Sequence, residues 1–124
     1  MDKFTREKVL EILNKCWSPD SSTKWTVENP ARGQCSVTAL VINDVFSGGI
    51  MKTMIDNEWH FYNFIDNERV DFTASQFPCK INYDDIKCKR VDASFDTDLK
   101  KFQYLSAEFR KQMKEHPELE LVKA

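Results

Sequence analysis

The sequence predicts an α+β domain in which a buried helix packs on a small antiparallel sheet and is flanked by N- and C-terminal helices. Residues 34–46 are apolar on nearly every side, and residues 50–73 alternate strand-forming runs with tight-turn residues. The 124 residues, of which 41% are hydrophobic and 31% charged, are enough for one hydrophobic core. We therefore expect residues 1–124 to form one domain.

The N-terminal half predicts two helices joined by a long loop. Apolar residues recur at helical spacing over residues 5–16, which indicates an amphipathic helix. Residues 20–33 are rich in Ser, Thr, Asn, Pro and Gly and predict a surface loop. Residues 34–46 predict a buried helix, and the Ser and two Gly at 47–49 are typical of a helix C-terminus.

Three strands follow the buried helix. The runs 50–55, 58–65 and 68–73 are rich in apolar and β-branched residues, and Asp-Asn pairs separate them at 56–57 and 66–67. Asp and Asn tolerate the left-handed conformation that two-residue hairpin turns require. These residues predict an antiparallel meander.

The C-terminal part predicts a second amphipathic helix over residues 99–114, where apolar residues again recur at helical spacing. The stretch 74–95 has no clear period, and we expect at most a short strand near 86–91. There is no internal repeat.

Charge and composition argue against several classes of partner. Eighteen Lys and Arg against twenty Asp and Glu give a net charge of -2, and no basic stripe is present. Nucleic acids and anionic membranes attract basic patches, so we expect neither as a partner. The N-terminal segment lacks the uncharged stretch of a signal peptide or transmembrane helix, which predicts a cytoplasmic protein. No feature predicts an oligomeric state.

The four cysteines, at positions 16, 35, 79 and 88, form no CxxC pair. Without an export signal we expect them to stay reduced, with no disulfide. A metal site built from Cys35, His60, Cys79 and Cys88 is disfavoured because their spacing matches no standard zinc pattern. We expect no metal and no cofactor.

Cys35 is the candidate nucleophile because it lies where the buried helix is predicted to begin. The partial positive charge and free N–H groups of a helix N-terminus favour the thiolate form of a cysteine. Gly33 allows a tight turn just before it. The simpler alternative is an inert core thiol, since free cysteines are among the most buried residues.

His60 and Asp71 are the candidate base and orienting acid. If Asp66 and Asn67 form a two-residue turn, Ile65 pairs with Glu68, and His60 and Asp71 become diagonal neighbours on one face of the sheet. Such positions are about 7–8 Å apart, a gap that two side chains can close. The alternatives are a core histidine and an aspartate that only braces a turn.

These residues resemble known families. A histidine on one strand, a turn, and Asp-x-Thr on the next strand resemble the transglutaminase-like core, and Gly-Gln-Cys opening an apolar helix is similar to that core and to papain-like folds. The run 29–77 resembles the YunG-like group of small uncharacterised bacterial proteins through Asn-Pro, Gly-Gln-Cys, Trp-His and Asp-Phe-Thr-Ala-Ser-Gln-Phe. The resemblance implies a papain-like fold with a Cys-His-Asp core and brings no substrate. The 25 residues from Cys35 to His60 are few for a transglutaminase, which disfavours crosslinking.

The sequence thus predicts a cysteine-dependent hydrolase or acyl transferase that acts on an amide or thioester bond through an acyl-Cys35 intermediate. Cys35, His60 and Asp71 are the expected catalytic residues. Gln34 and Trp25 are the nearest candidates for binding the substrate, a peptide or small molecule, and its oxyanion. The alternative is a catalytically inactive papain-like scaffold that binds a peptide or small molecule in the groove beside Cys35.

Overall fold

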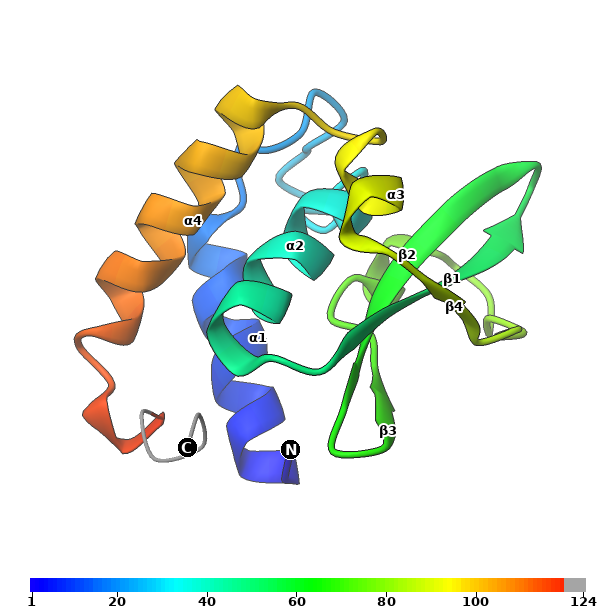
Figure 1. Ribbon diagram of the computed structural model, residues 1–124. Helices are drawn as coiled ribbons and strands as arrows, with labels where there is room; N and C mark the ends of the chain where they lie inside the picture. The colour runs from blue at the N-terminus through cyan, green and yellow to red at the C-terminus, as the bar shows by residue number, and fades with distance from the viewer. Residues whose placement is uncertain (120–124) are drawn as a thin grey trace.

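A central helix lies between a four-stranded antiparallel sheet and two outer helices in the computed structural model, which describes residues 1–119 (Figure 1). The α+β class with a small antiparallel sheet is therefore confirmed. In chain order the elements are α1 (Lys3–Cys16), α2 (Cys35–Phe46), β1 (Gly49–Ile55), β2 (Glu58–Ile65), β3 (Glu68–Val70), the 3-10 turn η1 (Ala74–Gln76), β4 (Ile86–Cys88), α3 (Arg90–Ser94) and α4 (Leu99–Met113).

The three predicted helices are all present. Helix α1 begins two residues earlier than predicted because the Asp2 carboxylate accepts a hydrogen bond from the Thr5 N–H at 2.8 Å and caps it. Helix α2 is buried along most of its length, as its apolar composition predicts. It ends where Ser47 and Gly48 adopt φ of 65° and 81°. The segment between α1 and α2 contains no regular element, in agreement with the predicted loop.

The strands β1, β2 and β3 form the predicted meander. All four residues of the Asp56-Asn57 and Asp66-Asn67 turns have positive φ, between 49° and 66°, as tight two-residue hairpin turns require. Ile65 pairs with Glu68, which is the predicted register. Strand β3 ends at Val70, earlier than the predicted residue 73, because the Asp71 carboxylate accepts the Thr73 N–H and turns the chain away from the ladder.

The stretch without a clear period supplies a fourth strand and a short helix. Strand β4 pairs antiparallel with β1, so the strand order is β3-β2-β1-β4. The predicted strand near 86–91 extends only to Cys88. It stops because the Asp92 carboxylate accepts the Lys89 N–H at 2.9 Å and starts α3, which the sequence did not predict.

Helix α2 is joined to its neighbours by apolar packing and by two buried hydrogen bonds. One core cluster lies among α1, α2 and α4, and a second lies between α2, α3 and the sheet. The Trp17 indole N–H donates to Thr38 Oγ1 at 2.9 Å, and the Asn63 side-chain amide of β2 donates to the Ala39 carbonyl at 3.0 Å. These bonds set the position of α2, and therefore of Cys35, relative to β2.

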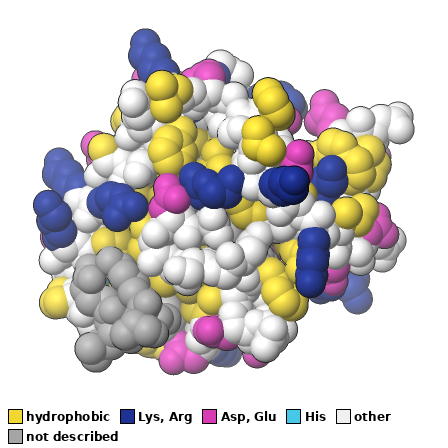
Figure 2. Space-filling model, viewed as in Figure 1, with side chains coloured by type: hydrophobic (Ala, Val, Ile, Leu, Met, Phe, Trp, Pro, Cys, Tyr) yellow, Lys and Arg dark blue, Asp and Glu magenta, His cyan; other side chains and the backbone are white. Residues whose placement is uncertain are grey.

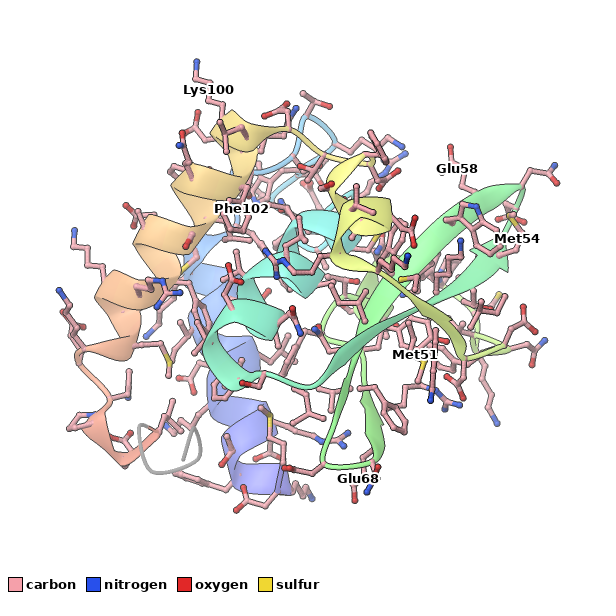
Figure 3. All side chains as sticks on the ribbon, in the orientation of Figure 1. Met51, Met54, Glu58, Glu68, Lys100 and Phe102 are labelled. Carbon is pink, nitrogen blue, oxygen red and sulfur yellow. The ribbon has the colours of Figure 1, made fainter. Side chains whose placement is uncertain are left out.

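The surface carries interspersed charges. On the face in Figure 2, basic, acidic and apolar side chains alternate. Figure 3 shows that the two hairpin tips lie at opposite ends of the sheet, with Met54 and Glu58 near one and Glu68 at the other. Within residues 1–119, none of the helices has both the length and the apolar character needed to cross a membrane.

Candidate functional site

Cys35 is the first residue of α2 and is half-buried at the wall of a cleft. The preceding turn is tightly constrained, because Gly33 has φ of 72° and a Cβ at this position would lie 2.4 Å from Ser22 Oγ. The Gly33 N–H also donates to Gln76 Oε1 at 3.1 Å. The sulfur is therefore presented at a helix N-terminus, where N–H groups lack helical acceptors.

His60 and Asp71 form a buried pair. His60 Nε2 and Asp71 Oδ2 are 2.7 Å apart, and the two side chains are 2% and 4% exposed. His60 comes from β2 and Asp71 directly follows β3, so the hairpin brings them together as predicted. A carboxylate on one ring nitrogen fixes the orientation of an imidazole and leaves the other nitrogen free for a proton transfer.

Asp71 accepts three further hydrogen bonds. The Thr73 backbone N–H and hydroxyl donate to Oδ1 at 3.1 and 3.3 Å, and the Tyr83 hydroxyl donates to Oδ2 at 2.8 Å. A buried carboxylate needs such donors to remain ionised. The Asp71 carboxylate is thus held in one orientation by Thr73, two residues further along the chain, and by Tyr83 from a separate loop.

Tyr83 is a site residue that the sequence did not reveal. Its ring lies 4.1 Å from the Arg69 guanidinium and meets the Tyr62 ring edge-on at 4.9 Å. Arg69 also binds Asp85, which accepts the Tyr62 hydroxyl at 2.8 Å. This network fastens the loop that carries Tyr83 to β2 and β3. Because residues 74–95 show no period, no sequence signal placed Tyr83 beside Asp71.

The surroundings of His60 favour its protonated form. Burial by itself lowers the pKa of His60, but the hydrogen bond from the ring to Asp71, the nearby Cys35 sulfur and the negative charges of both groups outweigh it. Together they raise the pKa of His60 to about 9. The folded protein thus favours the protonated form of the His60 ring at neutral pH.

The second ring nitrogen of His60 is not paired. Nδ1 is buried and has no hydrogen-bond partner of acceptable geometry among the described residues. Cys35 is close enough to affect the His60 pKa, and both residues line the same cleft. The Phe77 ring meets the imidazole edge-on with its centroid 5.0 Å away. Nδ1 is therefore the ring nitrogen that Asp71 leaves free for a proton transfer.

The cleft has a volume of about 660 Å³ and is open to solvent. Besides Cys35 and His60, its walls carry aromatic side chains, among them the exposed Trp59 and Phe95. Charges of both signs also line it, from Lys24, Arg32, Glu58, Asp92, Asp96 and Lys101. Such walls can accommodate both apolar and polar parts of a ligand.

Gln34 and Trp25 are not among the residues that line this cleft. Gln34 is completely buried as the N-cap of α2, and its side-chain oxygen and nitrogen both lack partners within residues 1–119. Trp25 packs against the core, with its indole nitrogen buried. Adjacency to Cys35 in the sequence suggested Gln34, but a side chain at the N-cap of a buried helix here turns into the protein. Gln76 and Phe77 contribute to the cleft instead.

The four cysteines are free thiols in different environments. Cys16 is buried, Cys35 and Cys88 are half-buried, and Cys79 is exposed. Burial, with a smaller contribution from Glu108, raises the pKa of Cys16 to about 11, and burial also raises the pKa of Cys88. Among residues 1–119, no three His, Cys, Asp or Glu side chains gather in a way that could hold a metal ion.

Comparison with known proteins places the chain in a family. A model of the YunG protein family matches residues 5–114. The chain belongs to the YunG family. It is 48% identical over 107 residues to the uncharacterised protein YunG of Bacillus subtilis (strain 168), a match that covers 86% of this chain and 93% of the relative. No solved structure matches the chain.

Proposed function

We propose that this YunG-family protein is a cysteine-dependent hydrolase or acyl transferase that acts on an amide or thioester bond through an acyl-Cys35 intermediate. The observation that carries the proposal is that Cys35 and His60 line one open cleft, while His60 is paired with the buried Asp71 and its Nδ1 has no partner among the described residues. The three residues are assigned the roles of nucleophile, base and orienting acid.

The proposed reaction has two steps. The Cys35 sulfur attacks the substrate carbonyl carbon after giving its proton to His60, and the imidazolium then protonates the leaving amine or thiol. Water or a second acceptor attacks the acyl-Cys35 thioester and regenerates the thiol. Asp71 stabilises the imidazolium and holds its orientation throughout, as its 2.7 Å contact with Nε2 permits.

The proposal extends to the fold. A papain-like core is supported by the chain order Cys35, His60, Asp71 and by the cysteine at the N-terminus of a helix that packs on the strand bearing the histidine.

A peptide or small molecule is the proposed substrate class, because the open cleft has both aromatic and charged walls. A cytoplasmic location is part of the proposal, because four free cysteines suit a reducing compartment.

The alternative function is ligand binding without catalysis. It is favoured by the exposed aromatic side chains of the cleft, Trp59 at 40% and Phe95 at 84% exposure, which are typical of recognition surfaces. In that case the His60–Asp71 pair would serve only the packing of the core, and Cys35 would be an ordinary thiol. The two functions differ in whether Cys35 becomes acylated.

Acylation with p-nitrophenyl acetate tests the proposal. The folded protein should release p-nitrophenolate and gain one acetyl group on Cys35, located by mass spectrometry of peptides. Cys35→Ser and His60→Ala should each lower the rate by about 100-fold or more. Cys79→Ser is the matched control because Cys79 is exposed and lies outside this cleft. Acetylation spread equally over Cys35 and Cys79 would favour the binding function.

A further inference from the structure

Gln76 is held rigidly next to the turn that leads into Cys35. Its backbone carbonyl accepts the Asn29 side-chain amide at 3.1 Å, and its side-chain oxygen accepts the Gly33 N–H at 3.1 Å. Gly33 is two residues before Cys35, at the beginning of α2. The amide group of Gln76 is therefore fixed at the N-terminus of the helix that carries the sulfur.

The nitrogen of this amide has no partner. Because Oε1 is used by Gly33, the Nε2 group is the free end of the amide, and it is buried without a hydrogen bond among the described residues. A buried donor without an acceptor is destabilising, and native structures rarely keep one without a reason. Gln76 also lines the cleft together with Cys35 and His60.

A reaction at Cys35 would supply the missing acceptor. When the sulfur attacks a carbonyl carbon, the C–S bond forms and the π electrons of the carbonyl move to its oxygen, which becomes an oxyanion. N–H donors fixed in advance around this oxygen lower the barrier. The N–H groups of the first turn of α2 also point out of the N-terminal end of the helix, where the Gln76 amide lies.

We infer that Gln76 Nε2 is an oxyanion donor for acyl transfer at Cys35, an inference that rests on the proposed function. The segment 71–77 would then supply three parts of the site. Asp71 orients the histidine, Gln76 donates to the oxyanion, and Phe77 packs edge-on against the imidazole. Gln34 also has an unpaired side-chain nitrogen among the described residues, but it does not line the cleft.

Two reagents separate this role from a structural one. p-Nitrophenyl acetate reacts through a tetrahedral oxyanion that collapses, expels p-nitrophenolate and leaves acetyl-Cys35. Iodoacetamide reacts by displacement of iodide at a saturated carbon, so no oxyanion forms. Gln76→Glu keeps an oxygen that can accept the Gly33 N–H but removes the donor. We expect it to slow acetylation of Cys35 by about tenfold or more, and to change alkylation by less than about twofold.

Controls make the outcome decisive. Gln76→Ala should show the same selective loss of acetylation, and it replaces Gln76→Glu if the latter does not fold. Gln103→Glu makes the same change on the exposed surface of α4 and should leave both rates unchanged. The role of Gln76 would be overturned if Gln76→Glu slowed acetylation and alkylation equally, or if it did not slow acetylation. In either case, acetylation of the wild-type protein at Cys35 would still uphold the proposed function. If wild-type Cys35 is not acetylated at all, the proposed function fails, and the role of Gln76 fails with it.

Discussion

His60 Nε2 and Asp71 Oδ2 approach to 2.7 Å across the β2–β3 hairpin, at a point where both side chains are almost completely buried. The contact leaves Nδ1 buried and without a hydrogen-bond partner among the described residues, in a ring that lines the same cleft as Cys35. Any reactivity of Cys35 should therefore depend on this pair, and the dependence can be measured without knowing the substrate.

Cys35 should be the first thiol to react when the folded protein is alkylated with iodoacetamide at pH 6. A helix N-terminus and a neighbouring histidine are surroundings that activate cysteines, and Cys35 has both. Burial instead raises the pKa of Cys16 to about 11 and that of Cys88 above its usual range. His60→Ala should move the onset of Cys35 alkylation to higher pH. Mass spectrometry of the digested protein measures all four sites.

Cys79 is the internal control for this experiment because it is exposed and lies outside the cleft. Equal rates at Cys35 and Cys79 at pH 6, together with no effect of His60→Ala, would contradict the catalytic interpretation. Asp71→Asn should give an intermediate result, because an amide orients the ring less well and carries no charge.

The free energy of unfolding should fall as the pH rises from about 6.5 to 9. The folded protein holds the His60 pKa at about 9, above the value of about 6.5 for an unfolded histidine, so the folded state binds an extra proton in this range wherever Cys35 retains its own. This stabilisation is fully present below about pH 6.5 and is lost through pH 9, at on the order of 1 kcal/mol per pH unit. Urea unfolding at several pH values measures it.

His60→Gln should flatten this dependence, whatever its effect on stability at pH 6, because the titrating group is gone. His116 provides the comparison, since it is also a histidine beside a carboxylate but is far more exposed, at 26%. A pH dependence that persists in His60→Gln and disappears in His116→Gln would show that His116, and not His60, causes it.

Tyr83→Phe should raise the His60 pKa further. The Tyr83 hydroxyl donates to the same Asp71 oxygen that contacts His60, at 2.8 Å, and therefore shares its negative charge. Its removal leaves more of that charge for the imidazolium and costs roughly 1 kcal/mol of stability. NMR titration of the His60 ring protons measures the shift.

Tyr104→Phe is the matched control. The Tyr104 hydroxyl donates to the Cys16 carbonyl at 3.4 Å and makes no hydrogen bond to Asp71. This variant should leave the His60 titration unchanged. An unchanged titration in Tyr83→Phe as well would mean that the Tyr83 contact with Asp71 is only structural.

Gly33→Ala should destabilise the protein by about 1–3 kcal/mol and lower the reactivity of Cys35. Residue 33 has φ of 72°, and the new Cβ would lie 2.4 Å from Ser22 Oγ, a hydroxyl that is itself bonded to the Arg32 carbonyl. Relief of this clash must either rotate the Ser22 hydroxyl away from the Arg32 carbonyl, with loss of that hydrogen bond, or move the turn before Cys35. Thermal unfolding and the iodoacetamide rate measure the two effects.

Gly49→Ala is the corresponding control, since a Cβ at Gly49 would meet nothing within 4 Å. Its stability should stay within about 0.5 kcal/mol of the wild type. If the two alanine variants behave alike, the constraint on the Gly33 turn does not hold the site.

The amino-acid sequence alone determined the β2–β3 hairpin and the pairing of His60 with Asp71. Asp66-Asn67 can adopt the two left-handed conformations of a tight turn, and the period of two along a strand then decides which side chains share a face. It likewise determined that α2 is buried and begins at Cys35, because apolar composition and the preceding glycine are local signals. These features depend on residues close together in the chain.

Only the tertiary structure decided which distant groups complete the site. Tyr83 reaches Asp71 across 12 residues and Gln76 reaches Gly33 across 43, through loops whose paths follow from packing and not from any period. Tertiary packing also keeps Gln34 out of the cleft. Helix α2 is covered on nearly all sides, and the side chain of its N-cap residue, Gln34, turns inward. Local rules set the faces of helices and strands, whereas the partners of a loop side chain depend on the whole fold.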